Sequence, residues 1–441
     1  MNSYIKPNGG GGGGGGGGSG SHRLKLGAFL HSDPALSNSL KESHSRPSNS
    51  SLGSPFRGGG GSGDRSPDEM TDFAPSPSPY IMSPYAKSPW SLAPNLLPSN
   101  HNGLIYTLVR EEGHVYSLAA SDDFLFTGSE SKNIRVWKQM KEFSGFKSNS
   151  GLVKAIVIAG DKIFTGHQDG KIRVWKFSPE NTKNPHRRLG TLPRIRDYIK
   201  SAFNPNNYVQ VRRHVSVPWI KHYDAVSCMS LDEKQGILYS GSWDKTFKVW
   251  RLSDSKCLES VIAHHDAVNS IVTGFDCLVF TGSADGTVKV WRRELMGKTT
   301  KHVLVQTLLE QESAVTALAT VIPQGLIYSG SSDGLVNFWE SKKRLSHGGV
   351  LHGHRAAVLC LSVAGNLVLS GSADKSICVW KRNMGGDHSF LSMLTGHGGP
   401  IKCLVMKEDC EPTSEGDRKW TVYSGSLDNS VKVWRVLDEQ M

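Results

Sequence analysis

Apolar and polar residues alternate in short segments from about residue 101 to the end of the chain, and tight polar turns join these segments in pairs. Within 277–291, the apolar run CLVF leads into TGSADG, which contains a hydroxyl residue, Gly and Asp. The next residues, TVKVW, alternate again and end in Trp. A period of two on both sides of a turn with Asp and Gly predicts a β-hairpin.

This hairpin occurs seven times. Besides TGSADGTVKVW (281–291), the copies are TGSESKNIRVW (127–137), TGHQDGKIRVW (165–175), SGSWDKTFKVW (240–250), SGSSDGLVNFW (329–339), SGSADKSICVW (370–380) and SGSLDNSVKVW (424–434). Another alternating segment, such as AVNSIVT from residue 267, precedes the hairpin, and one more strand would complete a small sheet. Seven such units at 101–441 predict an all-β fold, a seven-bladed β-propeller, because each sheet can bury its faces only against its neighbours.

The strand that closes the ring is predicted at residues 104–109. The segment HNGLIYTLVREE (101–112) is similar to KHVLVQTLLEQE (301–312), and few residues follow the last Trp, so the seventh blade lacks an outer strand of its own. We expect residues 104–109 to supply this strand, which would remove two exposed sheet edges.

Residues 1–100 differ in composition from the rest of the chain. They are rich in Gly, Ser and Pro, and Gly fills every position from 9 to 18. Such a segment cannot offset the entropy of ordering, so we predict a disordered tail. The chain begins without a secretory signal and has no apolar stretch of about 18 residues, so we expect a soluble intracellular protein without a membrane partner. Six serines that precede Pro are candidates for phosphorylation: Ser54, Ser66, Ser76, Ser78, Ser83 and Ser88.

Four residues recur together around the hairpin unit: a His ahead of the unit, a Ser or Thr that opens it, an Asp in its turn and a final Trp. This constellation resembles the WD40-repeat family. The resemblance implies that the four residues form a hydrogen-bonded structural network inside a blade. The matching residues are His222, Ser240, Asp244 and Trp250; His264, Thr281, Asp285 and Trp291; His354, Ser370, Asp374 and Trp380; and His397, Ser424, Asp428 and Trp434. Blades one, two and five have Glu111, Asn149 and Gln311 at the His position, so we expect fewer internal hydrogen bonds there.

Repetition of this network favours a scaffold over an enzyme, because an active site needs one constellation and a scaffold needs one in each blade. A buried carboxylate and a buried indole also need partners for structural reasons alone. The seven cysteines are scattered and include no CxxC pair, which argues against a disulfide framework and a zinc site. We therefore expect no catalytic residue, no cofactor, no metal and no small-molecule substrate.

Positive charge is concentrated in one insertion. The chain has a formal net charge of +11, and residues 183–221 alone hold nine Lys or Arg and one acid, Asp197. The Trp residues that end neighbouring hairpins lie 38 to 54 residues apart, except for a spacing of 75 between Trp175 and Trp250. We place the insertion at about 185–220, between blades two and three. The outer strand of blade two is either 187–193 or 211–220.

Three interpretations of the insertion are open: binding of an acidic protein segment, binding of nucleic acid, or packing against the propeller. Its candidate binding residues are Arg194, Arg196, Tyr198, Arg212 and Arg213. Basic residues also follow six of the seven hairpin Trp residues, as either a solvated rim or a ring that binds a polyanion.

Members of the family often bind peptides on the face that carries the Asp turns. Trp243, His265 and Arg355 would lie there, and Trp243 is either an exposed anchor or packed under the insertion.

The chain also resembles the plant WD40 proteins of the JINGUBANG type in three segments: HYDAVSCMSL, the insertion RDYIK…NPNNYV…VRRH, and SPYAKSPW. This resemblance implies a non-enzymatic regulator of the nucleus and cytoplasm that binds transcription factors and restrains pollen germination. Two alternatives stay open. One is a substrate receptor of a cullin–RING ubiquitin ligase, which would use Trp339, Glu340, Ser341 and Lys342; the other is a propeller associated with nucleic acid.

Overall fold

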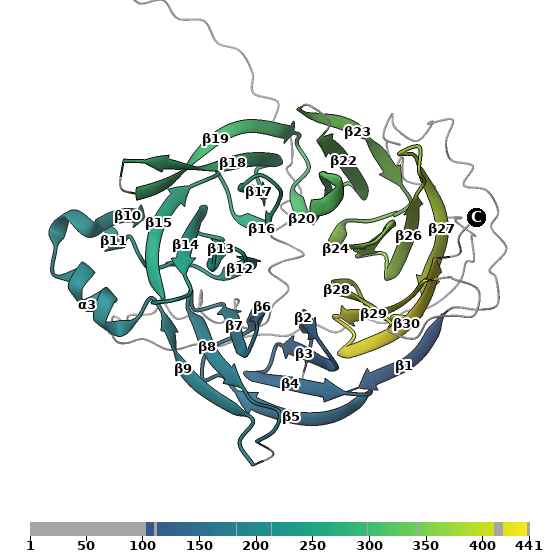
Figure 1. Cartoon of the computed structure of the whole chain (residues 1–441), viewed down its shortest axis with the longest axis horizontal. Coiled ribbons are helices and arrows are strands. Elements are labelled where there is room, and N and C mark those ends of the chain that lie inside the picture. Colours follow the sequence, from purple (N-terminus) through teal and green to yellow (C-terminus); the bar gives the residue numbers. More distant parts are fainter. Residues whose placement is uncertain are drawn as a thin grey trace, which may run out of the picture. The chain divides into compact units, whose positions relative to one another are not determined.

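The computed structural model describes residues 103–109, 113–181, 183–212, 214–297, 299–341, 344–409 and 418–438. Over these residues, seven four-stranded sheets form a ring around a central channel (Figure 1). The predicted all-β, seven-bladed propeller is confirmed. The tail predicted at 1–100, with its six Ser-Pro sites, lies outside the described residues. No helix in the described part of the chain has the length and apolar character needed to cross a membrane.

Each blade is an antiparallel sheet whose strands follow one another in sequence from the channel to the perimeter, except that the perimeter strand of blade seven is β1 (Leu104–Val109) (Figure 1). Blades one to three consist of β2 (Val115–Ser121), β3 (Phe124–Ser129), β4 (Asn133–Lys138) and β5 (Lys141–Lys147); β6 (Val153–Ala159), β7 (Lys162–His167), β8 (Ile172–Phe177) and β9 (His186–Leu192); and β12 (Val226–Asp232), β13 (Ile237–Ser242), β14 (Thr246–Arg251) and β15 (Lys256–Ile262).

Blades four to seven continue in the same order, and a short 3-10 helix, η3 (Ile322–Gln324), joins two strands of blade five. Their strands are β16 (Val268–Thr273), β17 (Leu278–Ser283), β18 (Thr287–Met296) and β19 (Thr299–Glu310); β20 (Val315–Val321), β21 (Leu326–Ser331), β22 (Leu335–Ser341) and β23 (Leu345–His352); β24 (Val358–Ala364), β25 (Leu367–Ser372), β26 (Ser376–Arg382) and β27 (His388–Thr395); and β28 (Ile401–Glu408), β29 (Arg418–Ser426) and β30 (Ser430–Asp438) with β1 (Leu104–Val109).

The core lies between blades. Phe164 of blade two and Trp250 of blade three, for example, belong to one cluster of buried side chains. The Gly in the hairpin motif makes this packing possible: a Cβ on Gly282 would lie 2.6 Å from Cγ1 of Val315 in the next blade. A side chain at this position would force the two blades apart, which explains why Gly follows the first hydroxyl residue of the motif.

Polar side chains on the channel strands also join neighbouring blades. Ser117 Oγ donates a hydrogen bond to the carbonyl oxygen of Val153 (3.1 Å), and Asn269 Nδ2 donates one to that of Val315 (2.9 Å). The inner wall of the ring is therefore held by hydrogen bonds as well as by apolar packing.

The ring is closed by the first and last strands described. β1 pairs antiparallel with β30, with Leu104 opposite Trp434 and Val109 opposite Ser430. The structure thus has the closing strand that the pattern predicts at 104–109, and blade seven is built from both ends of the propeller sequence.

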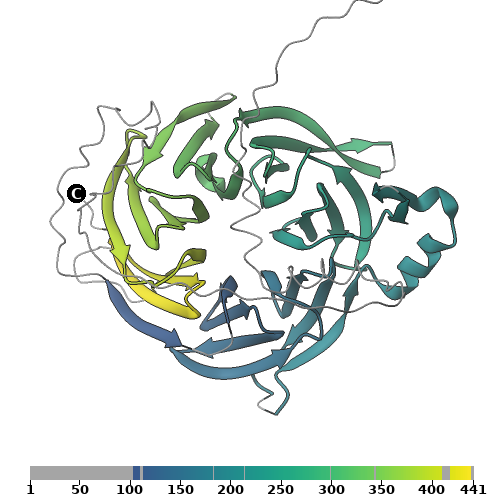
Figure 2. The ribbon, with the colours of Figure 1, turned by 180° about the vertical axis from the view of Figure 1, so that it is seen from behind.

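The insertion begins later than the predicted 185–220. β9 pairs with β8 and is the outer strand of blade two, so the alternative at 211–220 is wrong and the insertion starts at Pro193. It contains the helix α3 (Ile195–Ala202), the 3-10 turn η2 (Pro205–Asn207) and a hairpin of β10 (Tyr208–Arg212) and β11 (Val215–Pro218). These elements project from the perimeter beside blades two and three (Figures 1 and 2).

Candidate functional site

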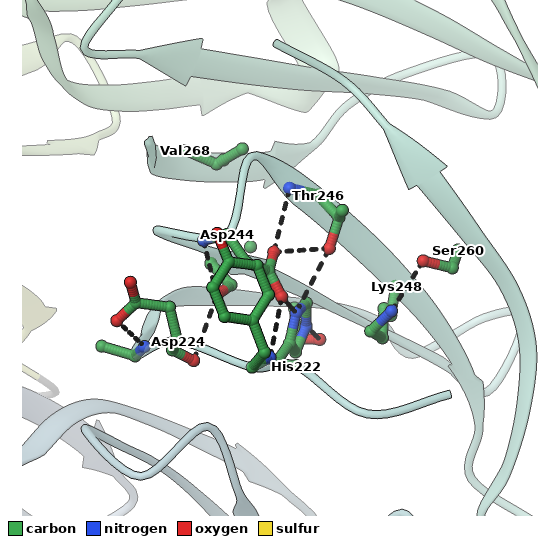
Figure 3. Close-up of polar contacts among 12 residues, drawn as sticks. His222, Asp224, Asp244, Thr246, Lys248, Ser260 and Val268 are labelled. Carbon is green, nitrogen blue, oxygen red and sulfur yellow. Dashed lines mark hydrogen bonds and ion pairs between the residues drawn. The ribbon is translucent and has the colours of Figure 1, made fainter. Parts of the chain in front are cut away.

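The polar network is most completely buried in blade three (Figure 3). His222 lies in the loop before β12 and connects the turn of the hairpin to its first strand: its Nδ1 is 2.8 Å from Asp244 Oδ2, and its Nε2 is 2.9 Å from Ser240 Oγ. Trp250 Nε1 donates to the same Ser240 Oγ (2.9 Å). Asp244 also accepts hydrogen bonds from the backbone N–H and the hydroxyl of Thr246.

The donors and acceptors determine the protonation of this network. Because an ionised Asp244 can only accept, His222 Nδ1 carries a proton, and Nε2 of a neutral ring accepts the Ser240 hydroxyl proton. Burial lowers the pKa of His222 in spite of its acidic neighbour. Burial would raise the pKa of Asp244, but His222 and the Thr246 hydroxyl outweigh it and lower that pKa well below its usual range. The side-chain polar atoms of His222, Ser240, Asp244 and Trp250 then all take part in hydrogen bonds within the blade.

Blades four and seven repeat this geometry. His264 Nε2 is 2.7 Å from Thr281 Oγ1, to which Trp291 donates at 2.9 Å, and His264 Nδ1 is 3.2 Å from Asp285 Oδ2. In blade seven the matching contacts join His397 to Asp428 (2.8 Å), His397 to Ser424 (2.7 Å) and Trp434 to Ser424 (2.7 Å).

Blade six keeps only part of the network. His354 lies 2.9 Å from Asp374 Oδ2 and 2.6 Å from Ser370 Oγ. The Trp380 ring packs edge-on against His354, with ring centroids 6.2 Å apart.

The expectation of fewer hydrogen bonds is wrong for blade two. His167, at the third position of TGHQDG, lies where the other hairpins have Ser, and its Nε2 is 2.8 Å from Thr165 Oγ1. Trp175 donates to this hydroxyl (3.1 Å), and His167 Nδ1 donates to the carbonyl oxygen of Gly151 (3.0 Å). A histidine from the hairpin itself therefore replaces the loop histidine, and the sequence signal was its position in the motif.

Blades one and five differ from each other. In blade one, Ser131 takes the place of the turn Asp: its Oγ is 2.8 Å from Ser129 Oγ and accepts from the N–H of Asn133 (3.2 Å). Glu111 lies outside the described residues. In blade five, Ser329 Oγ is buried without a hydrogen-bond partner among the described residues, which agrees with the expectation of fewer internal hydrogen bonds in this blade.

The turn carboxylates also shape one face of the propeller. The backbone N–H groups of His265 and Arg355 donate to Asp285 Oδ2 (2.9 Å) and Asp374 Oδ2 (3.0 Å). Both side chains are exposed. The network therefore fixes the backbone beneath two of the predicted surface residues and leaves their side chains available.

Trp243 lies on this turn face, half-buried, with a partner that the sequence did not indicate. The ammonium group of Lys154, from β6 of blade two, is 4.5 Å from the centroid of the Trp243 ring and 5.0 Å from that of Tyr116 on β2 of blade one. Three blades thus contribute to one cluster of two aromatic rings and a cation, which we call the turn-face cluster. The cation that contacts Trp243 comes from a channel strand and not from the insertion. Trp243 is therefore not a wholly exposed anchor, and packing under the insertion is not shown.

The predicted insertion residues divide between surface and core. Arg194 and Arg196 are exposed, and Arg194 pairs with Asp197 (Nε to Oδ2, 2.9 Å). Tyr198 is half-buried against the cluster that contains Trp250. Arg212 ends β10, its side chain is not described, and Arg213 lies outside the described residues. The insertion lies on the perimeter and is a separate candidate surface from the turn face.

The family described as "WD domain, G-beta repeat" matches residues 103–138, 215–251, 255–292, 346–381 and 388–435. The chain contains WD40 repeats. Blade two and the first three strands of blade five lie outside the matched WD40 segments, and both blades lack a His in the loop before the first strand.

Curated proteins with similar WD40 segments have diverse names. The human kinesin-like protein KIF21A is 28% identical over 249 residues, which are 50% of this chain and 14% of that protein. The nuclear distribution protein nudF of Aspergillus niger is 24% identical over 48% of this chain and 55% of its own length. The Arabidopsis thaliana protein ROOT INITIATION DEFECTIVE 3 is 28% identical over 37% of this chain and 40% of its own length. The chain thus spans from about a seventh to about half of these relatives.

Charges at the rim of the WD40 blades are largely used within the fold. Of the six basic residues that follow the hairpin Trp residues, Lys176 pairs with Asp161 (3.2 Å) and Arg251 with Asp254 (2.7 Å), which favours a solvated rim at these two blades. Glu340, the acid of the ubiquitin-ligase alternative, pairs with Arg382 of blade six at 2.9 Å and is mostly buried. Lys342 lies outside the described residues.

Proposed function

We propose that this protein is a non-catalytic scaffold that binds regulatory proteins, such as transcription factors, through the turn face of its propeller. The observation that carries the proposal is the turn-face cluster of Tyr116, Lys154 and Trp243. Aromatic rings held in place by neighbouring side chains are typical of residues that contribute most to protein binding. WD40 propellers are in general scaffolds, and the network above holds its protons in structural hydrogen bonds.

The chemistry of the face favours a partner segment with acidic and apolar side chains. Lys154 offers a cation between two rings, and the exposed His265 and Arg355 extend the polar surface on the loops of blades four and six. An apolar side chain can pack on the Trp243 ring, which Lys154 holds in place, while the exposed Arg355 attracts a carboxylate.

The biological setting is a further part of the proposal. The likeness of the insertion and of SPYAKSPW to the JINGUBANG-type proteins supports a plant developmental regulator, present in nucleus and cytoplasm, that restrains pollen germination. Imaging of a tagged full chain in germinating pollen, and germination counts in plants that lack it, would test this setting apart from the binding face.

Affinity purification of the full chain from plant tissue tests the binding face. The double variant Trp243→Ala and Lys154→Ala should lose most co-purified transcription factors, and direct titration with one purified factor should show at least about a tenfold loss of affinity. A control variant, Met384→Ala and Lys234→Ala, changes the same number of side chains at exposed positions. Equal recovery by the two variants would refute the proposal, and partners released by nuclease would instead support the nucleic-acid alternative.

A further inference from the structure

The helix of the insertion has an apolar stripe that faces solvent. Ile195, Ile199 and Phe203 are spaced by four residues and therefore lie along one side of α3. Their exposed fractions are 75%, 47% and 82%. The opposite side holds the helix to the propeller, with Tyr198 packed against the core and Ser201 buried. Large apolar side chains at this spacing on an outward helix face need an explanation beyond folding.

The stripe is held in place by the rest of the insertion. Trp219 and Tyr198 pack against the same buried cluster, and the backbone N–H of Trp219 donates to the carbonyl oxygen of Asn207 (2.8 Å). The buried ammonium of Lys248 donates to the carbonyl oxygen of Trp219 and to Ser260 Oγ (2.6 Å; Figure 3 shows this second bond). Because α3 is anchored on its inner side, the outer apolar side chains cannot turn into the core.

Positive charge without an acidic partner borders the stripe. Arg196 and Lys200 follow Ile195 and Ile199 directly in sequence and form a second row on the exposed side of α3. Among the described residues, neither they nor the nearby Lys256 form an ion pair, whereas Asp197 is taken by Arg194. The exposed surface is therefore apolar along one row and basic along the next.

A hollow lies on the far side of the basic row. Its volume is about 270 Å³, and its lining includes Lys200, Ser201, Trp219, Lys256 and Cys257, together with Asp197, whose carboxylate is paired with Arg194. Ser201 Oγ is buried there without a hydrogen-bond partner among the described residues. A hollow with an apolar wall, two ammonium groups and an unused hydroxyl suits a side chain that enters from a segment lying across α3.

We propose that the outer side of α3 and this hollow form a second docking surface, which binds a short acidic, amphipathic segment of a partner protein. Apolar side chains of the segment pack on Ile195, Ile199 and Phe203, and its carboxylates face Arg196, Lys200 and Lys256. The concave hollow favours a peptide over a membrane, because a bilayer surface does not enter it. This surface is separate from the turn face and does not depend on the function proposed for it.

Fluorescence anisotropy of the full chain tests this surface with a labelled peptide, EELDFLDELLEE. The variant Ile199→Ser with Phe203→Ser and the variant Arg196→Glu with Lys200→Glu should each weaken binding at least about tenfold. Matched controls, Ile262→Ser with Met384→Ser and Lys234→Glu with Lys301→Glu, change exposed residues elsewhere and should bind like the unmodified chain. Circular dichroism and the thermal midpoint verify that every variant is folded.

Two further probes identify what the surface recognises. A peptide with Lys at every acidic position and one with Ala at every apolar position should both bind at least about tenfold more weakly. Equal binding of all three peptides, or equal binding by the α3 variants and their controls, would overturn the proposal. So would α3-dependent binding to phosphatidylserine vesicles without binding to the peptide. The α3 variants should keep their affinity for a factor bound through Trp243 and Lys154, so failure of one proposal is distinguishable from failure of the other.

Discussion

Blade two should make the propeller sensitive to mild acid. Burial lowers the pKa of His167 to about 4, although its bond to the Gly151 carbonyl opposes the shift. In the unfolded chain the same side chain titrates near pH 6.5. Between these values the unfolded chain binds more protons than the folded chain, so stability is retained above pH 6.5 and lost as the pH falls toward 4. The turn carboxylates lose their contribution only at lower pH, because their pKa values are lowered from an ordinary value of 3.8.

The size of the effect follows from the shift. Each unit of pH inside the window changes the free energy of unfolding by up to about 1.4 kcal/mol per site, so His167 should account for a loss of about 2 kcal/mol between pH 7 and pH 5. His167→Asn keeps an amide N–H for the Gly151 carbonyl but cannot titrate. Its free energy of unfolding at pH 7 should be lower, and its further loss at pH 5 should be smaller than that of the unmodified chain by about 2 kcal/mol.

Urea unfolding followed by Trp fluorescence at pH 7, 6 and 5 measures both quantities. His352→Asn, at an exposed position, controls for the loss of a histidine as such. The other buried histidines are common to all three proteins and cancel in the comparison. Parallel plots of stability against pH for the unmodified chain and for His167→Asn would refute this account of blade two.

Two other predictions concern buried polar groups. Ser424→Ala removes the hydroxyl that contacts His397 and Trp434 and should cost about 2 kcal/mol, whereas Ser329→Ala removes a hydroxyl without a partner among the described residues and should cost less than about 0.5 kcal/mol. Equal shifts of the urea midpoint would contradict this contrast. Lys248→Met removes a buried donor beneath Trp219 and should speed tryptic cleavage after Arg194 and Arg196, as mapped by mass spectrometry. Lys289→Met removes the matching donor to Ala263 in blade four and should leave those two sites as resistant as before.

Much of the propeller could be predicted because its signals are local and repeated. Hairpins, their turns and the closing strand follow from short patterns that recur in register, and each copy supports the others. A local pattern also explains why 211–220 was a wrong alternative for the outer strand of blade two. Alternation indicates a strand but not its partner, and Val215–Pro218 pairs with β10 inside the insertion instead of with β8.

The candidate surfaces needed tertiary structure. Lys154 and Trp243 are far apart in sequence and lie in different blades, so no local pattern places them together. The helical spacing of Ile195, Ile199 and Phe203 is visible in the sequence, but Pro193 and Pro205 on either side and the density of arginines are typical of a charged loop. The pattern of a histidine in the loop before the first strand does not include His167, because this residue lies inside the hairpin.

The closing strand has a consequence for synthesis of the protein. Lys432 of β30 donates a hydrogen bond to Thr107 of β1 across 325 positions of the chain. At about 5–20 residues per second, β1 emerges from the ribosome roughly 16 to 65 seconds before its partner. During that interval six blades can assemble, while Leu104, Ile105 and Tyr106 remain on an unpaired strand. Ring closure therefore joins the oldest strand to the newest, and until then the unpaired edge is open to the matching strand of a neighbouring nascent chain.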